Sequence, residues 1–164
     1  MSRPRLVLVG PPGAGKTTVG QLVAARLGVG FRDTDADIEA VAGKPVAEIF
    51  YDEGEQRFRD LECAAVRSAL ETHDGVLSLG GGAVLDPDTR QLLQRHEVVL
   101  LQVGLADAAR RVGLSRDRPV LALNPRATLH HLLAERLPFY LEVAGRTVDT
   151  DAKSPQQVAD EVLA

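Results

Sequence analysis

The segment Gly10–Thr17 carries the strongest chemical signal in the sequence. It reads Gly-Pro-Pro-Gly-Ala-Gly-Lys-Thr, follows the apolar run Leu6–Val9 and precedes a helical pattern. Glycines in such a loop let successive N–H groups and the next helix N-terminus point at one site, which suits nucleotide phosphates. Lys16 then reaches the β- and γ-phosphates of ATP or GTP, and the Thr17 hydroxyl ligates Mg²⁺. The residues expected to contact the nucleotide here are Gly13, Ala14, Gly15, Lys16, Thr17 and Thr18.

Asp33 and Asp35 lie two residues apart at the end of a second extended segment. Because side chains alternate along a strand, both carboxylates project to the same side. One can hold the Mg²⁺ hydration shell while the other accepts a hydrogen bond from a substrate hydroxyl and raises its nucleophilicity. The apolar run Val76–Leu79 ends in glycine instead of aspartate, which makes Asp33 the expected acidic contributor to the metal. The alternative is helix capping by Thr34 or Asp35.

Three glycines, Gly80, Gly81 and Gly82, follow the run Val76–Leu79. Consecutive glycines cost backbone entropy, and the usual compensation is a close approach of main-chain N–H groups to a ligand. The triplet therefore predicts contact with a ligand, and a flexible turn is the alternative.

Two arginines on helical stretches are candidates for an anionic ligand. Arg59 has Glu62 three residues on, and taken alone this spacing favours a surface ion pair that contributes little. Arg136 precedes Leu137 and is equally compatible with an ordinary helical arginine. The local pattern therefore does not assign either arginine to an anionic ligand.

The segment from Gly113 to Asn124 combines glycine, proline and charges without clean periodicity, and we expect a mobile lid here. Phosphoryl transfer needs water excluded and extra positive charge on the γ-phosphate at closure. Arg118 is the natural candidate for that charge. Arg110 and Arg111, just before this segment, either stack on a base or end a solvated helix.

Strands alternate with helices along the chain, which predicts an α/β fold with a parallel sheet and helices on both faces. Ligands in such sheets bind at the carboxyl ends of the strands, where the glycine-rich and acidic motifs fall. The expected strands are Leu6–Val9, Val29–Arg32, Val76–Leu79, Val98–Val103 and Arg146–Val148.

The chain has 164 residues, a formal net charge of −4 and one cysteine. Its length suits one domain over residues 1–164. The negative charge argues against a general affinity for nucleic acid, which needs a basic face. One cysteine excludes an internal disulfide, no apolar run is long enough to span a membrane, and the early first strand leaves no room for a signal peptide. We therefore expect a cytoplasmic monomer that binds neither nucleic acid nor membrane.

Six motifs follow one another from residue 5 to about residue 157. They are G-P-P-G-A-G-K-T at the first loop, D-T-D at 33–35, F-R at 58–59, S-L-G-G-G-A-V at 78–84, R-D-R-P-V-L at 116–121 and R-L-P-F-Y at 136–140. In this order and spacing they closely resemble the shikimate kinase family. The resemblance implies a three-layer P-loop NTPase fold, like that of the nucleoside-monophosphate kinases, with a five-stranded parallel sheet flanked by helices. It also implies Mg²⁺-dependent transfer of the ATP γ-phosphate to the 3-hydroxyl of shikimate, in aromatic amino-acid synthesis.

The same resemblance assigns roles to the motif residues. It assigns Asp35 to the shikimate hydroxyls, Arg59 and Arg136 to its carboxylate, and the backbone of residues 80–82 to its ring. This donor set matches one carboxylate and three hydroxyls. On the nucleotide side, Arg118 is implied to act on the phosphates from the lid, and Arg111 and Pro155 to flank adenine. The implied catalytic residues are Lys16, Asp35 and Arg118.

Three other functions compete with this interpretation. A gluconate-type or nucleoside-monophosphate kinase is the nearest, because two arginines also grip a phosphate. A GTPase switch needs a guanine-reading N-K-x-D motif, which the sequence lacks. A non-catalytic ATP-binding module is disfavoured because Lys16, Asp35 and Arg118 are all present.

Overall fold

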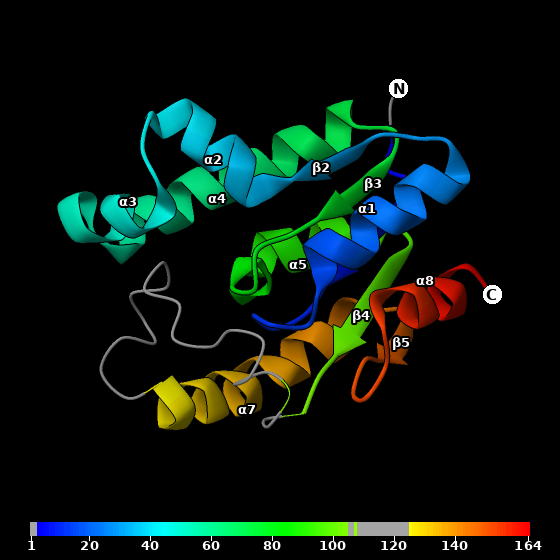
Figure 1. The fold of residues 1–164 in the computed structure, drawn as a ribbon. Coiled ribbons are helices and arrows are strands. Elements are labelled where there is room, and N and C mark those ends of the chain that lie inside the picture. The colour runs from blue at the N-terminus through cyan, green and yellow to red at the C-terminus, as the bar shows by residue number, and fades with distance from the viewer. Residues whose placement is uncertain (1–2, 105–106, 108–124) are drawn as a thin grey trace.

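The computed structural model, which describes residues 3–104, 107 and 125–164, is built around a parallel sheet of five strands (Figure 1). The strand order is β2-β3-β1-β4-β5, and each neighbouring pair is parallel. From the central strand β1 the chain crosses to the edge strand β2 and returns to place β3 between them, and β4 and β5 then extend the other side of β1. Because all neighbouring pairs are parallel, the five carboxyl ends share one edge. The strands are β1 (Leu6–Val9), β2 (Phe31–Asp33), β3 (Val76–Ser78), β4 (Val98–Gln102) and β5 (Arg146–Asp149).

Helices cover both faces of this sheet, because successive residues of its strands point to opposite faces and both sets are apolar. Leu6 and Leu8 of β1 join a core with α1 and α8, whereas Val7 and Val9 join a second core with α4, α5 and α7. The predicted three-layer α/β architecture is therefore confirmed. The helices are α1 (Lys16–Leu27), α2 (Thr34–Ala42), α3 (Val46–Glu53), α4 (Glu55–Thr72), the 3₁₀ helix η1 (Ala83–Leu85), α5 (Pro87–Leu93), α7 (Pro125–Val143) and α8 (Pro155–Leu163).

A third, smaller core joins α2, α3 and α4 beside the sheet (Figure 1). Its buried members are Ile38, Ile49 and Phe58, and the ring centroids of Phe58 and Phe50 lie 4.7 Å apart. Phe58 directly precedes Arg59 in the chain, so this packing fixes the turn of α4 that presents the arginine.

The expected strand Val29–Arg32 begins two residues too early. Gly28 ends α1 in the left-handed conformation, and its N–H bonds to Ala25 O while the Val29 N–H bonds to Ala24 O. Val29 thus belongs to the helix cap, and pairing with β3 begins only at Phe31. The predicted lid at 113–124 and the arginines at 110 and 111 lie outside the described residues. Among the residues described, no helix is long and apolar enough to cross a membrane.

Candidate active site

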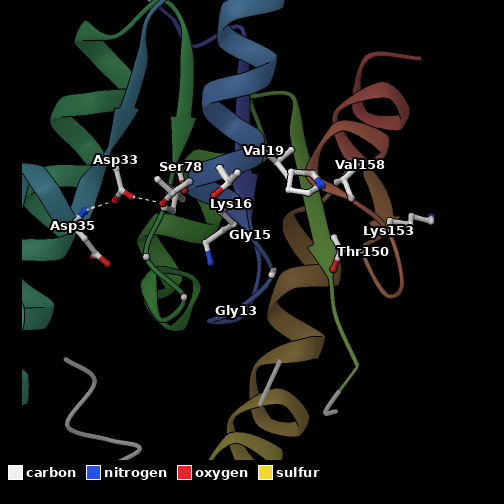
Figure 2. A pocket seen from close by; sticks show the side chains of 17 residues that line it. Gly13, Gly15, Lys16, Val19, Asp33, Asp35, Ser78, Thr150, Lys153 and Val158 are labelled. Carbon is white, nitrogen blue, oxygen red and sulfur yellow. Dashed lines mark hydrogen bonds between the residues drawn. The ribbon is translucent and has the colours of Figure 1, made fainter. Parts of the chain in front are cut away.

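A cavity of about 460 Å³ lies at the carboxyl ends of the strands (Figure 2). It is lined by the glycine-rich loop, the first turn of α1, the ends of β2 and β3, and the segment from Thr150 to Val158. Figure 2 shows Asp33 and Asp35 on one side of Lys16, with Thr150 on the other. The cavity therefore joins the predicted phosphate loop to the acidic pair and to a segment more than a hundred residues away in sequence.

The phosphate loop turns into α1 at Gly15, whose φ of 88° lies in the left-handed region that glycine adopts without strain. The Val19 N–H bonds to Gly15 O at 2.9 Å and closes the first turn of the helix. The amides that precede Val19 lack a carbonyl one turn earlier and point out of the helix N-terminus, toward the cavity. The Lys16 ammonium donates to Gly10 O at 2.7 Å and to Pro11 O at 3.1 Å, which keeps its charge against the loop.

Asp33 performs two structural tasks at the end of β2. Its Oδ1 accepts the Asp35 N–H at 2.8 Å and caps α2, and its Oδ2 accepts the Thr17 hydroxyl at 3.1 Å. The capping residue is therefore Asp33 and not Thr34 or Asp35, because Asp33 is the last extended residue before the helix. The Thr17 hydroxyl directs its proton at Asp33, which leaves its oxygen lone pairs available to a cation.

The three glycines after β3 are closely approached by charged side chains from α2, α4 and α7. A Cβ atom built on Gly80 would lie 2.7 Å from Asp35 Oδ1 and 3.0 Å from Glu62 Oε2. On Gly82 it would lie 2.6 Å from Arg59 Nη2, and on Gly81 it would lie 3.4 Å from Arg136 Nη1. A side chain at Gly80 or Gly82 would therefore occupy space that the charged groups fill, and these groups would have to move.

Arg59 and Glu62 form the expected i, i+3 ion pair, with Nη1 and Oε1 2.7 Å apart. The expectation of a surface pair is wrong, because the Glu62 side chain is 4% exposed and that of Arg59 is 19% exposed. Burial raises the pKa of Glu62, against the positive charge of Arg59. Glu62 therefore holds Arg59 in place beside the triplet, and the burial of its carboxylate carries a desolvation free energy that destabilises the fold.

Arg136 is buried on α7, which excludes the alternative of an ordinary exposed helical arginine. Its Nε is shielded from solvent and has no hydrogen-bond partner among the described residues. A buried guanidinium N–H without a partner destabilises the fold, and an acceptor atom of a bound ligand would relieve this by accepting its hydrogen bond. The geometry thus places two arginines at the triplet, a pair whose charges suit an anionic ligand such as a carboxylate.

One wall of the cavity is formed by the loop between β5 and α8. Both carboxylate oxygens of Asp151 accept the Gly104 N–H, at 2.9 and 3.0 Å. Ala152 has a φ of 57°, and its N–H bonds to Asp107 Oδ2 at 3.1 Å. These contacts attach the loop to the residues that follow β4, and Pro155, at the end of the same loop, lines the cavity.

The structure brings most of the predicted site residues together at one edge of the sheet. Asp35, Arg59 and Arg136 converge on the triplet, and Thr17 contacts Asp33. Arg111 and Arg118 lie outside the described residues, and the assigned roles stay predictions. The sequence indicated Glu62 only as an ion-pair partner of Arg59, without its burial. Asp151 and Tyr140, which contact the backbone of Gly104 and Gly81, were not singled out; Asp151 lies in no motif, and Tyr140 stands in R-L-P-F-Y.

A family model described as shikimate kinase matches residues 12–164 of this chain. The shikimate kinase of Salinispora arenicola is 62% identical over 161 residues, which span 98% of this chain and 96% of that protein. The shikimate kinase of Streptomyces coelicolor is 53% identical over 163 residues, or 99% of this chain and 95% of that protein.

Solved structures give the same result. The shikimate kinase from Acinetobacter baumannii in complex with shikimate superposes with a TM-score of 0.94 at 36% identity, and the match covers 99% of this chain and 92% of that one. The shikimate kinase from Aquifex aeolicus gives a TM-score of 0.84 at 29% identity, with 97% and 94% covered. With a family model over nearly all of its length and relatives above half identity, the chain belongs to the shikimate kinase family.

Proposed function

We propose that this protein transfers the γ-phosphate of ATP to the 3-hydroxyl of shikimate, with the acceptor bound at the glycine triplet. As a member of its family, the protein is a phosphotransferase that acts on shikimate. The observation that carries the residue assignment is the convergence of Asp35, Arg59 and Arg136 on residues 80–82, beside the phosphate loop. A kinase needs its two anionic substrates side by side, and this proposal is supported by Asp35, Gly80 and Gly81, which line the same cavity as the phosphate loop.

On the acceptor side, Arg59 and Arg136 bind the shikimate carboxylate through charge-assisted hydrogen bonds. The buried Nε of Arg136 supports this role, since an incoming carboxylate would give it an acceptor. Asp35 accepts a hydrogen bond from a ring hydroxyl and draws its proton as the oxygen attacks. Because phosphoryl transfer depends mostly on positioning and charge neutralisation, holding the hydroxyl in line is the larger part of this task.

On the nucleotide side, the amides of the phosphate loop, the α1 N-terminus and Lys16 bind the triphosphate. Thr17 and Asp33 would hold Mg²⁺, and their oxygens are the donors that this cation prefers. Their 3.1 Å hydrogen bond supports the fit, because it aims the hydroxyl lone pairs away from Asp33. When bound, the metal neutralises charge on the phosphates. Pro155, at the cavity wall, is placed to flank the base.

The remaining assignments rest on the sequence. Arg118 acts on the phosphates from a lid at about 113–124, and Arg111 packs on the adenine. We also propose that residues 1–164 form one domain that works as a cytoplasmic monomer, in keeping with a single cysteine and a net charge of −4.

A substrate panel tests the function. Purified protein with ATP and Mg²⁺ is offered shikimate, gluconate, AMP or CMP, and ADP release is followed in a coupled assay. Shikimate alone is expected to stimulate release. Stimulation by AMP would instead assign the arginines to a phosphate, and stimulation by gluconate would assign them to an open-chain acid.

A further inference from the structure

The glycine triplet is held by hydrogen bonds at every one of its peptide groups, although Gly-Gly-Gly is the most flexible sequence a chain can have. The Gly80 N–H donates to the Thr34 hydroxyl at 3.3 Å, and Gly80 O accepts the Ala83 N–H at 3.1 Å. Gly82 O accepts the Leu85 N–H, also at 3.1 Å. These three bonds fix the peptides on either side of the centre of the triplet.

The central peptide, between Gly81 and Gly82, is fixed by Tyr140 alone among the described residues. The Tyr140 hydroxyl donates to Gly81 O at 2.6 Å, and the side chain is 1% exposed. Because a peptide unit is planar and trans, holding this carbonyl also sets the direction of the Gly82 N–H on its opposite edge. Burial raises the pKa of Tyr140 to about 12, so the hydroxyl remains a donor at any working pH.

Tyr140 also connects the triplet to Arg136, which lies one helical turn earlier on α7. The Arg136 side chain interacts with the phenol, and its Nη1 is near Gly81. The phenol therefore touches both the backbone and the cation that form this part of the acceptor site. A shift of the Tyr140 hydroxyl would change the two together.

We propose that Tyr140 is a positioning residue for the acceptor: its hydroxyl orients the Gly81–Gly82 peptide and fixes the position of this peptide relative to the Arg136 guanidinium. This inference rests on the proposed acceptor site at the triplet. The Tyr140 hydroxyl would thus increase the affinity for shikimate without touching it. It does so by pre-organising the backbone of residues 80–82, which would otherwise be ordered only when shikimate binds.

The test is Tyr140→Phe, which removes the oxygen and keeps the ring. We expect the Kd and the KM for shikimate to rise about three- to tenfold, as for loss of one neutral hydrogen bond. The KM for ATP is expected to change less than about twofold, because the phosphate loop is not involved. Hydrogen exchange should become faster in the peptide that covers residues 80–83.

Val143→Ala is the matched control, since Val143 is buried on the same helix one turn later and its alkyl side chain can form neither a hydrogen bond nor an ion pair with the triplet. It removes core volume without loosening the Gly81 carbonyl. Thr34→Val gives a second variant, which frees the Gly80 N–H at the other end of the triplet and should raise the same shikimate constants.

Each outcome decides one point. A rise for Tyr140→Phe that Val143→Ala does not share supports the inference. An equal rise for both variants overturns it, because general loosening would then be the cause. An unchanged shikimate Kd in Tyr140→Phe, with a large rise in Arg59→Ala, overturns the inference and leaves the acceptor site standing. An unchanged Kd in Arg59→Ala refutes the acceptor site itself.

Discussion

Replacing Gly82 with alanine removes no hydrogen bond, and we still expect it to damage the acceptor site. The backbone of Gly82, with φ −97° and ψ 1°, is accessible to alanine, so the change introduces no conformational strain. The added Cβ would instead lie 2.6 Å from Arg59 Nη2 and 2.7 Å from Arg59 Cζ. Contact distances between such atoms are about 3.5 Å or more, so the guanidinium must retreat by roughly 1 Å.

We expect this movement of Arg59 to change the stability of the fold little and to weaken the binding of shikimate strongly. Arg59 already contacts Glu62 at 2.7 Å and Glu55 at 3.5 Å on its own helix, so it can withdraw without leaving Glu62 unpaired. A carboxylate that loses this charge-assisted contact loses about 1.5 to 3 kcal/mol of binding free energy, or roughly 10- to 100-fold in affinity. We therefore expect the shikimate KM of Gly82→Ala to rise by that factor, with the melting temperature nearly unchanged.

The assay is steady-state kinetics with shikimate varied at saturating ATP, followed by ATP varied at saturating shikimate. Gly145→Ala is the matched control, because among the described residues a Cβ there would meet only Val98 O, at 3.8 Å. In an Arg59→Ala background, Gly82→Ala should add almost nothing, since no guanidinium remains to be displaced. A shikimate KM that stays at the wild-type value in Gly82→Ala, or full additivity of the two changes, would refute the reasoning.

Two further predictions concern residues outside the proposed contacts. Asp151→Ala removes both acceptors of the Gly104 N–H and loosens the loop that carries Pro155, so the KM for ATP should rise several-fold while the KM for shikimate holds; the reverse pattern would contradict this. Burial raises the pKa of Glu62 above 4.5, so the folded protein binds this proton more tightly than the unfolded chain and loses stability as pH rises from 4.5 through the folded pKa. Glu62→Gln should remove that loss in denaturant titrations between about pH 4 and pH 8, and parallel pH profiles for the two proteins would contradict the assignment.

The parts of the fold that could be predicted from the sequence are those with local causes. The phosphate loop was recognisable because its glycines, its lysine and the flanking strand and helix are contiguous, and the structure places them as the motif requires. The start of β2 was missed because a helix cap at Gly28 consumes the Val29 amide. The alternative of helix capping in D-T-D named Thr34 or Asp35 where the structure has Asp33, because spacing alone does not reveal which residue is the last extended one.

The buried ion pair of Arg59 and Glu62 shows where sequence reasoning fails and why. Helical spacing correctly makes the two residues neighbours on α4, but it says nothing about what covers them. The cover is the turn at Gly80–Gly82, about twenty residues later in the chain, and it can approach only because it has no side chains. A surface arginine and a site arginine are therefore locally identical in sequence, and the information that separates them lies in the glycines. Arg136 is also buried, and its Nη1 lies close to Gly81, a neighbour more than fifty residues away in sequence that its local pattern does not reveal.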